Sequence, residues 1–188
     1  GSLSIIGATN ILNASIDVSA ANDSYRSGIV TLGGRNIHFK TTGTSLGSEF
    51  EFGDTLAPDM IGKLYLDLTD IVEMDAWELN IGNLEQEKGE ITQTITFEAV
   101  TEPEDEVDLT GDRIFLAAQN DITLNQGAVI KGTGSSGMVS LLSADGNIDM
   151  RDNTLISSTH TLAIDANRLL RGTGSEISTE KAMAISSN

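Results

Sequence analysis

The carboxylate side chains of this chain are the groups whose number and spacing best suit a metal-binding or acid/base site. A run of five near residue 105 offers the oxygen ligands that Ca²⁺ prefers, but it lacks the spaced ligand and glycine order of a preformed calcium loop. Its members are Glu102, Glu104, Asp105, Glu106 and Asp108. We expect this run to be a solvated, charged linker, and a Ca²⁺ site is the alternative.

A second set of side chains could bind or process a sugar. Glu73 and Asp75 lie two positions apart and would face the same way on a strand, and two carboxyl groups about 5 to 9 Å apart can perform glycosidic acid/base chemistry. Trp77 and Tyr65, among few aromatic residues, could stack on sugar rings. The simpler interpretation is a solvated strand face for the carboxylates and a packing role for both rings. These four residues form the possible ligand or partner surface.

The sequence predicts no catalytic residue. Ser157, Ser158 and His160 are close together, but neighbours in an extended strand alternate faces, so Ser158 and His160 would only project side by side. A nucleophile also needs a base oriented by a third group and a nearby oxyanion hole. The chain has no cysteine, which excludes disulfides and thiolate metal sites. We therefore expect a protein that is not an enzyme and has no cofactor.

The charge is concentrated in one part of the chain. The net charge is −17, and residues 46–110 hold 18 of the 28 acidic residues with only Lys63 and Lys88 to offset them. A field of this sign repels phosphate groups and anionic lipid, so nucleic acid is not an expected partner. No apolar run approaches the roughly 18 residues of a membrane-spanning helix, so we expect no membrane insertion.

A repeat occupies the last third of the chain. Apolar-x-apolar triplets end at Leu116, Leu141, Ile164 and Ile185, which are 25, 23 and 21 positions apart. Within each period, a second and a third short apolar segment follow after polar corners, and the corners are rich in Gly, Asn, Asp and Ser. Three short strands per turn of roughly 23 residues is the plan of a parallel β-helix, in which successive turns stack to bury a continuous core.

The rest of the chain divides into two parts. Residues 1–45 show the same alternation between glycine-rich corners, although Gly1 and Ser2 have the form of a scar from a cleaved tag. Residues 46–110 contain three candidate strands, at 63–68, 77–81 and 91–99. This acidic segment is either a set of wider β-helix turns with an acidic outer face or a subdomain that protrudes from the stack. We expect an all-β protein with β-helix turns at 1–45 and 111–188, interrupted by an acidic β-rich insertion at 46–110.

Residues 111–137 and 138–159 resemble the haemagglutination-type repeats of filamentous haemagglutinin and related large bacterial exoproteins. In those repeats a strand leads through a turn of the type Ala-x-Gly/Asn-Asn/Asp-Ile to a second strand, and a polar corner leads to a third. The resemblance implies a right-handed parallel β-helix, secretion to the bacterial cell surface, often with an outer-membrane transporter as export partner, and a role in adhesion. It implies no catalytic residues.

These observations leave three functions open. The first is a structural or adhesive segment of a large secreted surface protein, with a host or bacterial surface protein or glycan as partner. The second is a carbohydrate-binding or carbohydrate-active β-helix. In the third, the acidic insertion binds Ca²⁺ or a protein partner.

Overall fold

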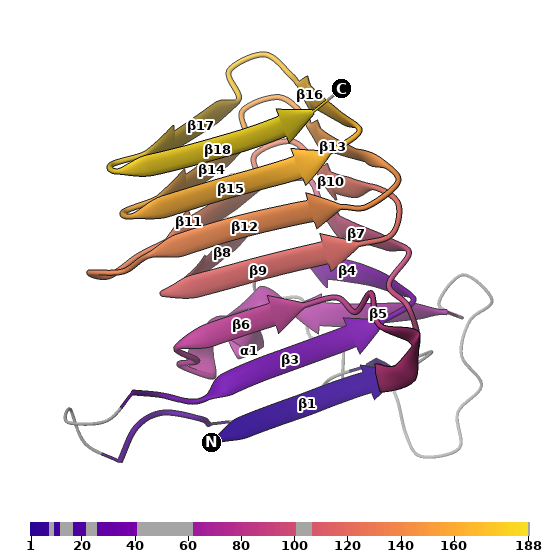
Figure 1. The fold of residues 1–188 in the computed structure, drawn as a ribbon, viewed down its shortest axis with the longest axis vertical. Coiled ribbons are helices and arrows are strands. Elements are labelled where there is room, and N and C mark those ends of the chain that lie inside the picture. The colour runs from indigo at the N-terminus through magenta and orange to yellow at the C-terminus, as the bar shows by residue number, and fades with distance from the viewer. Residues whose placement is uncertain (8–9, 12–16, 22–25, 41–61, 101–106, 188) are drawn as a thin grey trace.

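The computed structural model describes residues 1–7, 10–11, 17–21, 26–40, 62–100 and 107–187. In this part of the chain the strands form three sheets. Within each sheet the strands follow one another along the long axis of the molecule (Figure 1), and every strand pair is parallel. The described residues are mostly in strands, with one short α-helix and one 3₁₀ helix, which is compatible with the expected all-β class.

The order of strands within each sheet follows the stack. Sheet A consists of β1 (Ser2–Gly7), β3 (Ile29–Gly34), β6 (Glu78–Ile81), β9 (Arg113–Ala118), β12 (Met138–Ser143), β15 (Thr161–Ala166) and β18 (Ala182–Ser187). Sheet B consists of β2 (Asn10–Ile11), β5 (Lys63–Asp67), β4 (Asn36–Lys40), β7 (Thr94–Phe97), β10 (Ile122–Leu124), β13 (Asn147–Met150) and β16 (Arg168–Arg171). Sheet C consists of β8 (Asp108–Gly111), β11 (Val129–Gly132), β14 (Leu155–Ser158) and β17 (Glu176–Thr179). From β6 onward the chain visits sheets A, B and C in turn.

The predicted repeat is confirmed by the register of sheet A. Leu116 pairs with Leu141, Leu141 with Ile164, and Ile164 with Ile185, so the last residues of the four triplets lie in one column. The same column continues downward through Ile81. The spacing in the sequence varies because the corners differ in length, whereas the paired strands keep one register.

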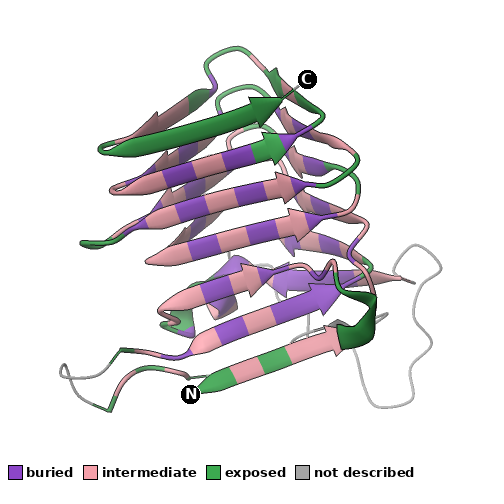
Figure 2. Ribbon diagram, in the orientation of Figure 1, coloured by how far each residue is buried: buried purple, intermediate pink, exposed green. Residues whose placement is uncertain are grey.

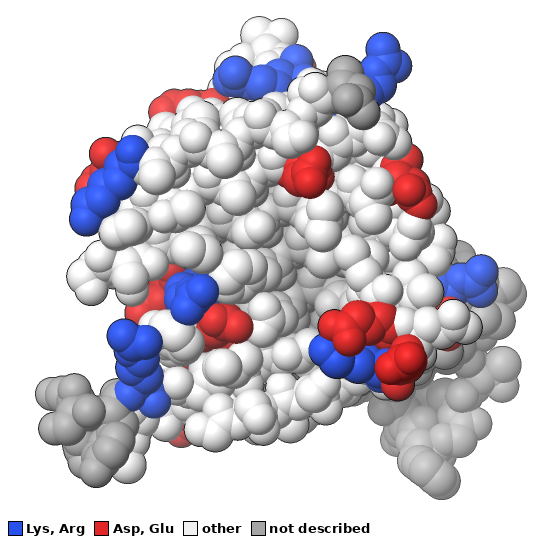
Figure 3. Space-filling view, viewed as in Figure 1, with Lys and Arg blue, Asp and Glu red and all other residues white. Residues whose placement is uncertain are grey.

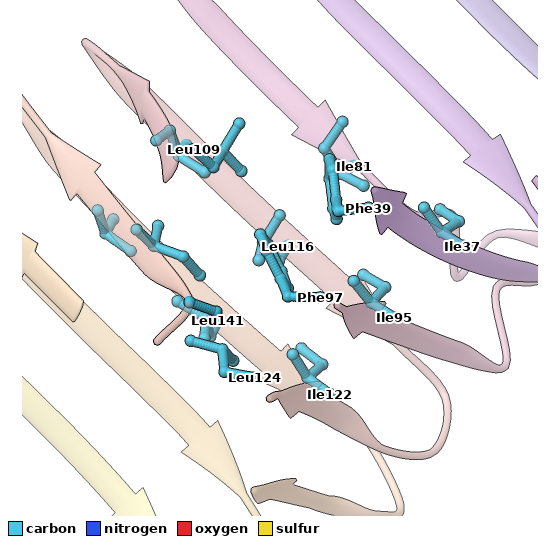
Figure 4. Close-up of a cluster of buried hydrophobic side chains, with 14 of the residues drawn as sticks. Ile37, Phe39, Ile81, Ile95, Phe97, Leu109, Leu116, Ile122, Leu124 and Leu141 are labelled. Atoms are coloured by element: carbon cyan, nitrogen blue, oxygen red, sulfur yellow. The ribbon is translucent and has the colours of Figure 1, made fainter. Parts of the chain in front are cut away.

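The core lies between the three sheets. Residues along most inner strands alternate between buried and partly exposed, as Figure 2 shows, because successive residues of a strand point to opposite faces. Figure 4 shows the buried side chains of neighbouring turns packed against one another, and they include Phe39, Phe97, Leu116 and Ile122. The rings of Phe39 and Phe97 are stacked with centroids 4.4 Å apart.

The strand order departs from the chain order once in the described part of sheet B. β5 follows β4 in sequence but lies between β4 and β2, so it is an additional strand on this sheet. A short helix, α1 (Leu68–Glu73), follows it and packs against β5 and β8. Asp67 caps its first turn by accepting a hydrogen bond from the Thr69 amide at 2.8 Å.

Helix α1 corrects part of the sequence interpretation. Apolar residues at positions 68, 71 and 74 recur at helical spacing and are all buried, and the helix covers the core below β8. The predicted strand at 63–68 therefore ends at Asp67. The predicted strand at 91–99 is shorter, at 94–97, and the one at 77–81 begins at Glu78. A single-turn 3₁₀ helix, η1 (Gln86–Lys88), lies between β6 and β7.

The strands of the acidic segment belong to the same three sheets as their flanking strands. β6 pairs with β3 on one side and β9 on the other, and β7 pairs with β4 and β10. Residues 41–61 and 101–106 lie outside the described residues. At the far end of sheet A, all residues of β18 are exposed. No described helix combines the length and hydropathy needed to cross a membrane.

Candidate binding cleft at Trp77

The four residues of the possible ligand surface do not form one site. Tyr65 lies on β5 in sheet B, where its ring is 5.4 Å from that of His38, and the ammonium group of Lys40 lies 5.2 Å from its centroid. Trp77 directly precedes β6 in sheet A. The two aromatic residues therefore belong to different faces of the molecule.

The pair Glu73 and Asp75 is not on a strand. Glu73 is the last residue of α1, and Asp75 lies beyond the helix with a positive φ of 48°. The expectation that both face the same way on a strand is wrong, because the apolar residues of this segment follow a helical spacing. Asp75 accepts a hydrogen bond from the Ser27 hydroxyl at 3.3 Å.

The run proposed for Ca²⁺ is described at one position only. Asp108 lies on β8 and pairs with Lys131 on the neighbouring β11, with 3.6 Å between the ammonium nitrogen and the carboxylate oxygen. The other four members, Glu102, Glu104, Asp105 and Glu106, lie outside the described residues. Within the described ranges, no group of three or more His, Asp or Glu side chains has the geometry to hold a metal ion.

The serine and histidine residues near position 158 also lack a catalytic arrangement. The Ser158 hydroxyl lies 3.0 Å from the Thr179 hydroxyl on β17, and a ring nitrogen of His160 lies 2.9 Å from the Thr161 hydroxyl. Ser158 is the last residue of β14 and His160 lies in the bend before β15, so the expectation that the two project side by side from one strand is wrong.

Trp77 is the centre of a cluster that the sequence did not reveal. The guanidinium carbons of Arg26 and Arg113 lie 4.6 and 4.8 Å from its ring centroid. Arg113 also lies 5.3 Å from the ring of Phe115. Such contacts between a guanidinium group and an aromatic ring are attractive and hold the ring in place. Trp77 is therefore fixed by its neighbours rather than free on the surface.

An ion pair connects this cluster to the sheet. Arg113 on β9 and Glu78 on β6 are register partners, and their charged groups lie 3.4 Å apart on the outer face of sheet A. Glu78 also accepts a hydrogen bond from the Asn80 side chain at 3.2 Å. Both charged side chains are partly buried, at 27% and 18% exposure. On this face, most of the charged side chains lie toward the margins (Figure 3).

A cleft of about 400 Å³ opens beside Trp77, in the lower part of the 300–1,000 Å³ range of small-ligand sites. It lies where α1, the start of β6 and the corner between β8 and β9 meet. One part of its wall is apolar and consists of Ile71, Val72, Ala76, Trp77 and Leu79. The other part is polar and consists of Arg26, Ser27, Asp75, Thr110, Gly111, Asp112 and Thr133. Val72 is 45% exposed, an unusual degree for a large apolar side chain here.

Several polar groups of this cleft have no partner within the described part of the chain. The side chains of Thr110, Asp112 and Thr133 make no hydrogen bond there, and Arg26 forms no ion pair. The guanidinium group of Arg26 lies over the Trp77 ring. The cleft thus combines an apolar wall with a free carboxylate, two free hydroxyls and a guanidinium group.

A larger cleft, of about 540 Å³, lies near β13 and β16 but differs in this respect. Most of its polar side chains are bonded to the protein. Arg151 pairs with Asp149 at 2.7 Å, Arg171 donates to the Ser175 carbonyl, and Asp152 accepts from the Thr173 amide. It also lacks an aromatic residue. The Trp77 cleft is therefore the better candidate for a ligand, despite its smaller volume.

Comparisons of this chain with family models, with curated proteins and with solved structures found no match.

Proposed function

We propose that this chain is a segment of a right-handed parallel β-helix from a large secreted bacterial surface protein, and that it serves attachment to a host or bacterial cell. The observation that carries the proposal is the regular succession of sheets. Each turn from β6 onward contributes one strand to each of the three parallel sheets, and equivalent apolar residues pair from turn to turn.

The arrangement suits a load-bearing stalk. Every inner strand is bonded to a strand above and a strand below, so the backbone hydrogen bonds run along the long axis. The outer residues of the turns can change without disturbing the core, because they alternate with the buried ones. A stack of this kind presents a long surface to a partner. The resemblance of residues 111–159 to haemagglutination-type repeats supports the same function.

Attachment can be measured with the purified chain. Fluorescently labelled protein is added to epithelial cells, erythrocytes and Gram-negative bacteria, and bound label is measured by flow cytometry over a range of concentrations. We expect saturable binding to at least one cell type that excess unlabelled chain displaces. The heat-unfolded chain is the control for nonspecific adhesion. Binding that never saturates, or that the unfolded chain reproduces, would contradict the attachment function.

A further inference from the structure

We propose that the cleft beside Trp77 binds the ring of a neutral sugar. This inference rests on the proposed attachment function and names the ligand class that one site of the chain recognises. Its basis is that the cleft is lined partly by apolar side chains and partly by hydroxyl, carboxylate and guanidinium groups, several of which have no hydrogen-bond or ion-pair partner within the described residues.

A sugar ring matches both walls. It presents C–H groups on one face and hydroxyls around its edge, and each hydroxyl can donate one hydrogen bond and accept two. The C–H face can pack on the exposed Val72 side chain and on the part of the Trp77 indole that the guanidinium groups of Arg26 and Arg113 leave open. The ring hydroxyls can donate to the Asp112 carboxylate and accept from Arg26. A few polar groups placed in a largely apolar cleft are the usual basis of orientation and specificity.

The charges and the apolar wall of the cleft together favour a neutral ligand. Its lining holds one cationic residue, Arg26, and two anionic residues, Asp75 and Asp112. An anion would meet these two carboxylates and the negative field of a chain with net charge −17. A compact cation would be attracted by these charges but would leave the apolar wall uncovered. An uncharged ligand with a C–H face and many hydroxyls can cover that wall and bond to groups of either sign.

The cleft is held open by the fold before any ligand arrives. The backbone amide of Trp77 donates to the Gly28 carbonyl at 3.0 Å, and the amide of Val18 donates to the Met74 carbonyl at 3.2 Å. The Ser27 hydroxyl bonds to Asp75 across the rim. These bonds fix the segment that follows α1 against the segment that precedes β3. A site that is already ordered loses little conformational entropy on binding.

The single tryptophan of the chain allows a direct test, because Trp77 lines the cleft. Tryptophan emission is followed while the intact chain is titrated with the methyl glycosides of glucose, galactose, mannose and N-acetylglucosamine. Sodium acetate, methylammonium chloride and the peptide Gly-Ser-Gly serve as anionic, cationic and peptide probes. We expect a saturable change in emission with at least one sugar and none with the other probes. No change with any sugar, or saturation by the peptide or an ion instead, would overturn the inference.

Variants that keep Trp77 locate the binding. Asp112→Asn retains the shape of the side chain and removes its charge, and we expect about tenfold weaker sugar binding, since a hydrogen bond to a charged group is lost. Thr133→Val replaces a free hydroxyl by a methyl group and should weaken binding several-fold. Leu170→Ala alters the other cleft and should leave the affinity unchanged. Equal affinities for Asp112→Asn, Thr133→Val and the parent chain would contradict a site at Trp77.

Failure of this inference can be told from failure of the attachment function. The Asp112→Asn variant is also applied to the cells of the attachment experiment. If the parent chain attaches but no sugar perturbs Trp77, the inference is wrong and attachment uses another surface. If the chain attaches to no cell type, the proposed function is wrong, whatever the result of the sugar titration.

Discussion

Phe39 and Phe97 are 58 positions apart in the sequence and lie directly opposite each other on adjacent strands of sheet B. Their ring planes are inclined by 22°, and both side chains are completely buried. Phe39 comes from the part of the chain that precedes the acidic segment, and Phe97 comes from within it. The contact places a strand of the acidic segment in the same core as the strand before it.

The first prediction concerns this contact. Phe97→Ala should lower the free energy of unfolding by about 3–5 kcal/mol, the usual cost of removing a fully buried ring. Thr96→Ala, one residue away on the outer face, should change it by less than about 0.5 kcal/mol. Urea denaturation followed by circular dichroism measures both. Similar costs for the two variants would contradict a shared core at β4 and β7.

The second prediction concerns Arg113 and Glu78. A double-mutant cycle with Arg113→Met and Glu78→Gln should give a coupling energy of roughly 1 kcal/mol, because both side chains are partly buried. The matched control is the pair Lys88 and Glu85, whose charged groups are 2.7 Å apart but more than 60% exposed. Its coupling should stay below about 0.5 kcal/mol. A coupling energy between Arg113 and Glu78 that is no larger than that of the control pair would contradict this prediction.

The third prediction concerns pH. Burial lowers the pKa of His38 below its ordinary value of 6.5, and the ammonium groups of Lys63 and Lys40 lower it further, while Glu98 opposes them. In the unfolded chain the His38 ring therefore takes up a proton near pH 6.5, whereas in the folded chain the same ring stays neutral at that pH. Stability should fall as the pH drops from that value toward the lower folded pKa, and His38 should stop contributing to the slope below it.

Two measurements check this dependence. His38→Gln should flatten the pH dependence of the unfolding free energy just below pH 6.5. Lys63→Met removes one of the neighbouring charges and should raise the pKa of His38, as measured by NMR titration of the ring protons. The same pH dependence of the unfolding free energy in His38→Gln and the parent chain would contradict the assigned environment. So would a pKa of His38 at or above 6.5 in the parent chain.

The repeated strands could be predicted because their signal is local. Triplets such as Val139-Ser140-Leu141 alternate along a strand, and alternation fixes which residues are buried. Helix α1 was missed because six residues are too few for a clear period. Its signal was present, however, in the capping Asp67 and in the three-residue spacing of Leu68 and Ile71. The position of β5 beside β4 and β2 has no local signal, because the pairing depends on the path of the intervening chain.

The cleft at Trp77 was only partly predictable. Trp77 and Asp75 were candidates from residue type alone, but the free polar groups come from other turns, and Thr133 is 56 positions from Trp77. One signal could have been used. Extending the triplet alignment to Leu79-Asn80-Ile81 places Glu78 opposite Arg113, a pairing of opposite charges on adjacent strands.

The central claim is that three consecutive strands form one stackable turn, and deletion of a whole turn tests it most directly. Removing residues 138–160 deletes β12, β13 and β14 and joins Gly137 to Thr161, which is the register partner of Met138. Small-angle X-ray scattering and circular dichroism would show a folded chain shortened by about 4.8 Å, the spacing of adjacent strands. Removing residues 138–150 instead deletes only β12 and β13, brings β14 to a position in sheet A, and should disrupt folding. An unfolded 138–160 deletion, or equal tolerance of both deletions, would contradict the claim.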